Sequence, residues 1–124
     1  MPLADYLWAM LIGFGLTITV ETAVLLLGLS RRHSRKVRLF AGVWLTACTY
    51  PIVWLVLPPL FEHRGLYLLV AETFAPVAEG ALFWWVFVKP LPPNRPATYR
   101  DLGAITAANL CSFGLGEVLH ALTG

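Results

Sequence analysis

The sequence has little charge and few cysteines. Of its 124 residues, 13% are charged, with 9 Lys+Arg and 7 Asp+Glu, and 2 are cysteine. An average soluble domain carries about 25% charged residues, and disordered chains are more polar still. The sequence also lacks a nucleotide-binding loop, an H-E-x-x-H zinc motif, a C-x-x-C pair and a Ser/His nucleophile arrangement. The low charge argues against a soluble or disordered protein. Because the catalytic motifs are missing, we expect a protein that is not an enzyme.

Apolar residues dominate instead. They make up 58% of the chain, more than a soluble domain of this size can bury. A transmembrane helix needs about 20 mostly apolar residues, and four stretches qualify: 7–29, 39–60, 66–88 and 101–122. The sequence therefore predicts an all-α fold, an integral membrane four-helix bundle with short loops that forms a single transmembrane domain over residues 1–124. The last stretch is rich in glycine and alanine, which predicts a tightly packed central helix.

The basic residues are distributed unevenly between the expected loops. Loops 30–38 and 89–100 hold 8 of the 9 basic residues, and Arg64 is the other. Because cytoplasmic loops are enriched in Lys and Arg, we expect both loops in the cytoplasm and both termini outside, in a bacterial inner (cytoplasmic) membrane. A basic cluster beside a membrane is first a topology signal, so no nucleic-acid partner is expected.

The second basic loop also carries signals for local structure. Four prolines between residues 89 and 100 favour an extended linker over a helix. Asp101 follows directly, at a position suited to an N-terminal cap of the fourth span. The sequence thus predicts that the last helix begins at about residue 101.

Four acidic residues fall inside the expected spans: Glu21, Glu72, Glu79 and Glu117. An ionisable residue at the bilayer centre costs about 2.5–3.5 kcal/mol, so such residues usually face the bundle interior and serve a function. The helical rise places Glu21 and Glu79 roughly 3–5 Å on the cytoplasmic side of the midplane. Glu72 and Glu117 are expected roughly 7–8 Å on the outer side. The spacing therefore predicts two layers of carboxyl groups within the bundle.

Other polar features share these depths. Thr46 and Asn109 are expected at the depth of the inner pair of glutamates. Pro51 and Pro76 each remove a backbone donor, which should bend their helices and free a carbonyl beside the carboxyl groups. Freed carbonyls next to carboxylates suit a cation, although prolines are also common in membrane helices for structural reasons. The sequence leaves both interpretations open.

The sequence also contains a single E-x-x-H motif, formed by Glu117 and His120. Di-iron bundles use this spacing on two helices, with further glutamates from two more. An outward-facing site for a divalent metal ion, made by Glu72, Glu117 and His120, is therefore one hypothesis. A haem held by two membrane histidines is not expected, because only His120 falls within a span.

Three functional hypotheses follow from these patterns. The first is a membrane protein that binds or relays a cation or protons in transport; its site would comprise Glu21, Glu72, Glu79, Glu117, Asn109 and Thr46. The second is an accessory or structural subunit of a larger membrane complex, in which protonated glutamates bond to neighbouring helices. The third is a membrane metal-binding protein or metalloenzyme. Four spans seal a polar interior imperfectly, so we expect a homo-oligomer or a larger complex within the lipid bilayer.

Overall fold

The computed structural model describes residues 2–123, which form four long α-helices and contain no strand. The helices are α1 (Leu3–Gly28), α2 (Arg35–Pro51), α3 (Arg64–Phe83) and α4 (Arg95–Thr123). Short helical segments extend two of them: η1 (Ile52–Val56) and η2 (Pro58–Leu60) follow α2, and η3 (Trp84–Val88) follows α3. All four extended helices are long and apolar enough to cross a membrane. The all-helical fold with four helices of membrane-spanning length is therefore confirmed.

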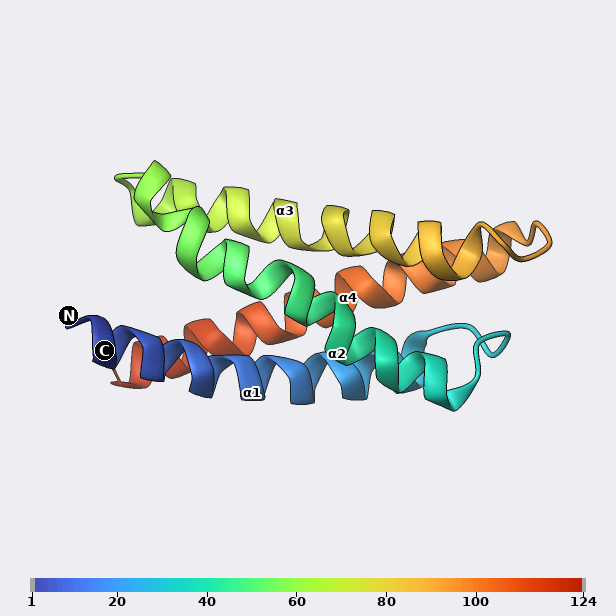
Figure 1. The fold of residues 1–124 in the computed structure, drawn as a ribbon, viewed down its shortest axis with the longest axis horizontal. Coiled ribbons are helices and arrows are strands. Elements are labelled where there is room, and N and C mark those ends of the chain that lie inside the picture. Colours follow the sequence, from blue (N-terminus) through green and yellow to red (C-terminus); the bar gives the residue numbers. More distant parts are fainter. Residues whose placement is uncertain (1, 124) are drawn as a thin grey trace.

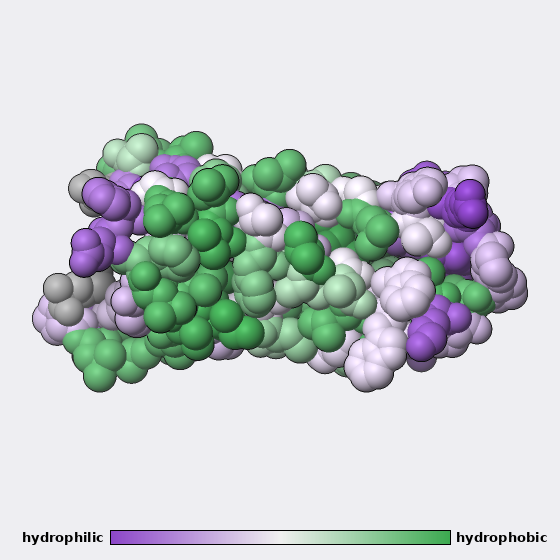
Figure 2. Space-filling view, turned by 90° about the horizontal axis from the view of Figure 1, so that it is seen from above, coloured by the Kyte–Doolittle hydropathy of each residue, from purple (hydrophilic) through white to green (hydrophobic). Residues whose placement is uncertain are grey.

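The helices form an antiparallel bundle in which α2 and α4 return along α1 and α3 (Figure 1). The beginning of α1 and the last turn of α4 lie at the same end of the bundle. We call this the turn end, because residues 57–63 connect α2 to α3 there; the opposite end, formed by residues 29–34 and 89–94, is the basic end. Hydrophilic side chains gather at both ends and mostly apolar ones lie between them (Figure 2). This distribution is expected of a bundle whose middle faces lipid.

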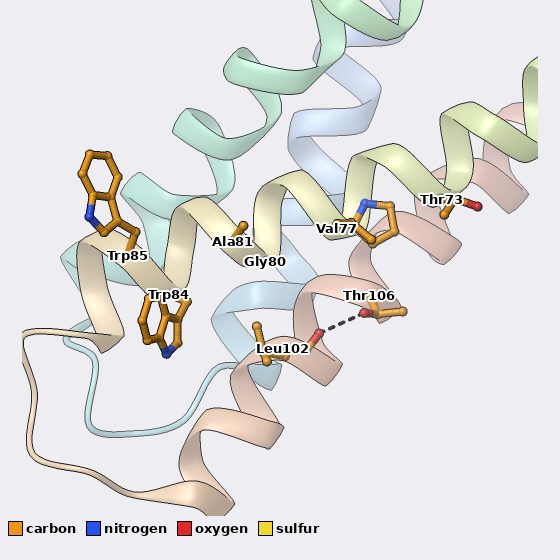
Figure 3. A pocket seen from close by; sticks show the side chains of 9 residues that line it. Thr73, Val77, Gly80, Ala81, Trp84, Trp85, Leu102 and Thr106 are labelled. Carbon is orange, nitrogen blue, oxygen red and sulfur yellow. Dashed lines mark hydrogen bonds between the residues drawn. The ribbon is translucent and has the colours of Figure 1, made fainter.

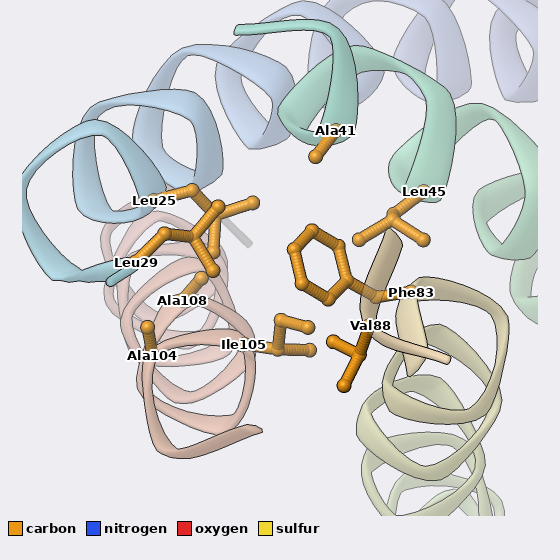
Figure 4. Close-up of a cluster of buried hydrophobic side chains, with 9 residues drawn as sticks. All are labelled: Leu25, Leu29, Ala41, Leu45, Phe83, Val88, Ala104, Ile105 and Ala108. Atoms are coloured by element: carbon orange, nitrogen blue, oxygen red, sulfur yellow. The ribbon is translucent and has the colours of Figure 1, made fainter. Parts of the chain in front are cut away.

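The apolar core lies toward the basic end. Its buried side chains come from all four helices (Figure 4): Leu25, Leu29, Ala41, Leu45, Phe83, Val88, Ala104, Ile105 and Ala108. Two glycines let backbones approach closely beside this core. A β-carbon on Gly42 would lie 2.8 Å from the Cα atom of Thr22, and one on Gly28 would lie 2.9 Å from the Cβ atom of Ala104. The first contact holds α2 against α1, and the second holds α4 against α1.

The second helix begins earlier than the sequence predicts. It starts at Arg35 rather than at residue 39, because the Ser34 side chain accepts a hydrogen bond from the Val37 N–H at 3.2 Å. Serine at this position pairs one of the N–H groups that a helix start leaves free. Residues 35–38 of the predicted loop 30–38 are therefore helical.

The fourth helix also begins earlier, and the prediction of an extended linker over residues 89–100 is wrong for residues 95–100, which are helical, whereas residues 89–94 are not. Asn94 accepts a hydrogen bond from the Ala97 N–H at 3.2 Å, so the helix starts at Arg95. Pro96 fits in the first turn because its missing N–H would have no helical partner there. Asp101 consequently lies well inside α4 and is not its cap.

Only some of the small residues of α4 lie where another helix packs closely against it. Ala104 contacts Gly28, as described above, whereas Gly103, Gly114 and Gly116 have open space around the position of a β-carbon. The prediction of a tightly packed central helix thus holds for one face of α4.

Candidate functional site

A cavity of about 770 Å³ lies among all four helices, between the core and the turn end. Each helix contributes one face to it. On α1 this face consists of Tyr6, Ala9, Gly13, Thr17 and Glu21, which are three or four residues apart and therefore share one side of the helix. All of the sequence-predicted site residues line this cavity: Glu21, Glu72, Glu79, Glu117, Asn109, Thr46 and His120.

The deepest part of the cavity holds Glu21 and Glu79, which are 2% and 3% exposed. The Thr46 hydroxyl donates to Glu21 Oε2 at 2.6 Å, and the Thr49 hydroxyl donates to Glu79 Oε2 at 2.9 Å. Asn109 also contacts the Glu79 carboxyl group. The structure thus brings together the four residues expected at one depth. Thr49 was not among the predicted site residues, although it lies on the same side of α2 as Thr46.

Each threonine hydroxyl lies next to a second acceptor in its own helix. Thr46 Oγ1 is 2.8 Å from the Gly42 carbonyl oxygen, and Thr49 Oγ1 is 3.1 Å from the Leu45 carbonyl oxygen. A hydroxyl group has one hydrogen to donate. Both contacts of a threonine can therefore be hydrogen bonds at once only when the carboxyl carries a proton and donates it to the threonine oxygen. An ionised carboxyl requires the hydroxyl to turn away from its helix carbonyl.

One oxygen of the inner pair is left over. Glu21 Oε1 is buried and has no hydrogen-bond partner among residues 2–123. Leaving a buried acceptor unpaired costs about 1–3 kcal/mol. Glu21 lines the cavity, so a carboxyl group with one unpaired oxygen forms part of the cavity wall.

The outer glutamates are more accessible and have different surroundings. Glu72 is half-buried, and it interacts electrostatically with Glu21 and Glu117. Glu117 forms a bidentate ion pair with Arg64, with N···O distances of 2.9 and 3.3 Å. The sequence does not predict this pair, because the expected spans leave Arg64 in a loop, whereas the structure places it at the start of α3.

The predicted divalent metal site is not assembled. Within residues 2–123, no three His, Cys, Asp or Glu side chains are close enough together to hold a metal ion. Glu117 is instead paired with Arg64, and His120 is exposed at the rim. Glu72, Glu117 and His120 line the same cavity without forming a ligand set.

Four aromatic residues surround the part of the cavity nearest the turn end: Tyr6, Tyr50, Trp54 and Tyr67. The Trp54 ring lies 5.3 Å from the Tyr6 ring and 5.6 Å from the Tyr50 ring, measured between centroids. The Tyr50 hydroxyl donates to the Met10 carbonyl at 3.1 Å. These residues were not predicted as part of the site. A usable signal was the spacing of Tyr50 and Trp54 from Thr46, since the three are four residues apart and share one side of their helix.

The backbone of η1 explains how two of these tyrosines are held. The Leu57 N–H bonds to the Ile52 carbonyl, five residues earlier, at 3.0 Å. Pro58, the next residue, has no N–H. The carbonyls of Val53 and Trp54 therefore lack their usual helical donors, and the hydroxyls of Tyr67 and Tyr6, respectively, donate to them instead.

Another buried carboxyl group, that of Asp101, lies at the basic end and is 0% exposed. Its Oδ1 accepts from the Ser30 N–H at 2.7 Å, and its Oδ2 accepts from Arg32 at 2.9 Å and lies 2.8 Å from His33 Nε2. Part of the basic cluster thus fixes the loop of residues 29–34 to α4. From the sequence alone, this cluster indicates only the topology in the membrane.

Two more arginines of the basic end hold the end of α1. Arg38 donates to the Leu26 carbonyl at 2.7 Å, and Arg100 donates to the Gly28 carbonyl at 2.9 Å. The last carbonyls of a helix lack intrahelical donors and carry partial negative charge. These arginines therefore cap α1 as well as adding positive charge.

A second hollow, of about 760 Å³, lies on the outside of the bundle between α3 and α4 (Figure 3). Its lining is almost entirely apolar and includes Val77, Trp84, Trp85 and Leu102. Thr106 is one of its two hydroxyl-bearing residues, and that hydroxyl already donates to the Leu102 carbonyl. This groove offers no group suited to a charged ligand.

No protein-family model, curated protein or solved structure matches this chain. The geometry of the cavity is therefore the basis for a function.

Proposed function

We propose that this chain is a small multi-pass membrane protein whose cavity binds or relays a cation or protons in transport. Glu21 and Glu79 form the inner site, and Glu72 and Glu117 lie along the path to it. The observation that carries the proposal is the pair of buried Glu–Thr contacts, each with alternative hydrogen-bond arrangements for a protonated and an ionised carboxyl. An ionisable residue within a membrane span is by default a functional candidate.

The glutamates form a sequence of neighbours. Glu117 and Glu72 interact electrostatically, as do Glu72 and Glu21, and Glu79 interacts with Glu21. Chains of carboxyl groups of this kind serve as proton relays in pumps and transporters. A proton or cation entering near Glu117 would therefore meet successive carboxyl groups on its way to the inner pair.

We place the basic end in the cytoplasm and the turn end outside, in a bacterial inner membrane. Loop residues 29–34 and 89–94 and the adjoining helix starts hold 8 of the 9 basic residues, in keeping with the positive-inside rule. In this orientation the cavity opens outward, and the packed core closes it on the cytoplasmic side.

Proton movement in liposomes tests the proposal. The purified chain is reconstituted into vesicles that contain a pH-sensitive dye, a pH gradient is imposed, and inorganic and organic cations are added outside in turn. We expect cation-dependent proton movement in the wild type and its loss in Glu21→Gln and Glu79→Gln, because glutamine cannot exchange a proton. Glu72→Gln should slow the movement.

Glu62→Gln is the matched control. Glu62 is exposed in the turn between α2 and α3 and does not line the cavity, so its variant should behave as the wild type does. The proposal fails if all the cavity variants also behave as the wild type, provided that each is inserted and monodisperse.

The apolar groove between α3 and α4 favours a second candidate, an accessory subunit of a larger membrane complex. Val77 and Trp85 are exposed in this groove, which leaves an apolar surface available to another helix. If the chain is an accessory subunit, it should move no protons in the liposome assay after purification, and it should become stable only when partner chains are present. A stable homo-oligomer that moves protons would favour the carrier.

A further inference from the structure

We propose that the cavity takes an organic ammonium cation, held between the inner carboxyl groups and the aromatic residues Tyr6, Tyr50, Trp54 and Tyr67. This inference rests on the proposed function and deepens it by naming the chemical class of the cation. It is carried by the coincidence of an unpaired buried carboxyl oxygen and a set of fixed aromatic rings in one cavity.

The cavity does not suit a bare metal ion. Its volume of about 770 Å³ falls in the range of sites for small organic molecules, roughly 300–1,000 Å³. Within residues 2–123, no three acidic, His or Cys side chains converge on one point. A metal ion requires several oxygen ligands at about 2.0–2.6 Å, whereas an organic cation spreads its charge over a larger surface.

The charge of the cavity suits a cation of this size. Three carboxyl groups, those of Glu21, Glu72 and Glu79, lie close enough to interact electrostatically. Arg64 is the one Lys or Arg among the described lining residues, and its guanidinium is engaged by Glu117. Glu21 lines this space, and its carboxyl group is buried and has one oxygen, Oε1, without a hydrogen-bond partner among residues 2–123.

The aromatic residues supply the second recognition element. A cation over the face of an aromatic ring is attracted by the ring quadrupole, most strongly by Trp, and this contact favours cations that shed their water easily. The hydroxyls of Tyr6, Tyr50 and Tyr67 all donate to backbone carbonyls. These bonds fix the rings before any ligand arrives, which lowers the entropic cost of binding.

Gly13 makes room for this arrangement. A β-carbon at Gly13 would overlap the Tyr50 hydroxyl and contact the Trp54 ring. The absence of a side chain on α1 thus lets the aromatic rings of α2 and η1 approach the carboxyl-bearing face of α1. The juxtaposition of rings and carboxyls is built into the packing of these two helices.

Calorimetry on the full chain in detergent, with tetraethylammonium chloride as the probe, tests the inference. Sodium and magnesium chloride at matched ionic strength serve as inorganic comparisons. We expect saturable binding of tetraethylammonium, its loss in Glu21→Gln, and a rise in Kd of roughly 2- to 30-fold in Trp54→Leu, because one strong aromatic face is removed. Trp8→Leu is the matched control, since Trp8 is exposed on α1 outside the cavity, and it should bind as the wild type does.

Trp54→Phe provides a second variant if the leucine variant does not fold. Phenylalanine keeps an aromatic face of lower strength, so its Kd should lie between those of the wild type and Trp54→Leu. Equal binding by the wild type and the Trp54 variants would overturn the inference, because the rings would then contribute nothing.

The results separate this inference from the proposed function. If protons or sodium act through Glu21 in the liposome assay while tetraethylammonium does not bind, the organic cation is ruled out and the proposed function stands. If no cation binds and no proton moves in any assay, both fail. Tetraethylammonium binding that depends on Glu21 and Trp54 supports both.

Discussion

Two buried carboxyl groups in this molecule have opposite surroundings. Asp101, at the basic end, is fully enclosed and receives hydrogen bonds or ion pairs from Ser30, Arg32 and His33. Glu21, in the cavity, is enclosed to nearly the same degree but receives one hydroxyl contact, from Thr46, and its second oxygen has no partner within residues 2–123. Burial alone therefore does not distinguish the two groups, whereas their partners do.

The difference follows the packing of the bundle. Asp101 lies beside the apolar core, where the loop of residues 29–34 folds back onto α4 and brings two basic side chains with it. Glu21 lies where the core gives way to the cavity, with other carboxyl groups as its neighbours. A carboxylate with cationic partners is held in one charge state, because losing the charge would strand those partners. A carboxyl among other carboxyls, with room beside it, can change its charge or accept a ligand.

The largest effect is expected when the charge of each carboxyl group is removed and the stability of the two variants is compared. Asp101→Asn should lower the free energy of unfolding by about 3–5 kcal/mol, since it leaves Arg32 with no counter-charge at a largely buried position. Glu21→Gln should change it by less than about 1 kcal/mol, because the neutral amide has nearly the same shape and can still pair with Thr46. Reversible unfolding in mixed detergent micelles, followed by circular dichroism, measures both.

Asp5→Asn is the control for the loss of an aspartate charge. Asp5 is exposed in the first turn of α1, so its variant should unfold as the wild type does. A loss of stability in Glu21→Gln as large as that in Asp101→Asn would contradict the comparison and make Glu21 a structural residue.

A smaller effect is expected where the two regions meet, at Gly42. Gly42→Ala should lower the free energy of unfolding by about 1–3 kcal/mol, because the new methyl group would overlap Thr22 and push α1 and α2 apart. The same displacement should lengthen the contact between Thr46 and Glu21. Unfolding in micelles measures the first effect, and the proton movement of the reconstituted variant measures the second.

Gly103→Ala is the matched control for Gly42→Ala. Both glycines lie inside helices, but Gly103 has open space around it. Alanine there should stabilise the helix by about 0.5–1 kcal/mol, since glycine loses more backbone entropy on folding. If the two variants have the same stability, the close approach at Gly42 does not hold the helices together.

The sequence predicted those features that depend on one helix at a time. Runs of apolar residues located the four helices, and helical rise brought Glu21 and Thr46 to the same depth before their contact was known. Prolines were misleading for α4, because Pro96 in a first helical turn looks the same in a sequence as a helix breaker. Local patterns therefore gave the helices and the depths, but not every boundary.

The sequence could not predict features that depend on the path of the chain in space. The Ser30 N–H and Asp101 are 71 residues apart, and Arg64 and Glu117 are 53 apart. No periodicity links such residues, so the basic cluster was interpreted by charge alone and the ion pair at the rim was missed. The aromatic residues of the cavity were missed for a different reason: tyrosine and tryptophan are common near membrane interfaces, and their number did not single them out.

The smallest expected effect concerns the ion pair between Arg64 and Glu117, which extends the comparison to a pair at the surface. The Arg64 and Glu117 side chains are 52% and 35% exposed, and exposed ion pairs contribute about 0.2–1 kcal/mol. Arg64→Gln should therefore lower the free energy of unfolding by no more than that. The loss should shrink as NaCl approaches about 1 M, where the screening length is about 3 Å, while the loss in Asp101→Asn should persist because its partners are shielded from solvent. If Arg64→Gln lowered the free energy of unfolding by more than about 2 kcal/mol, and salt did not reduce this loss, the ion pair would hold the rim as firmly as Asp101 holds the basic end. A rim held so firmly would restrict the access of ions to the cavity.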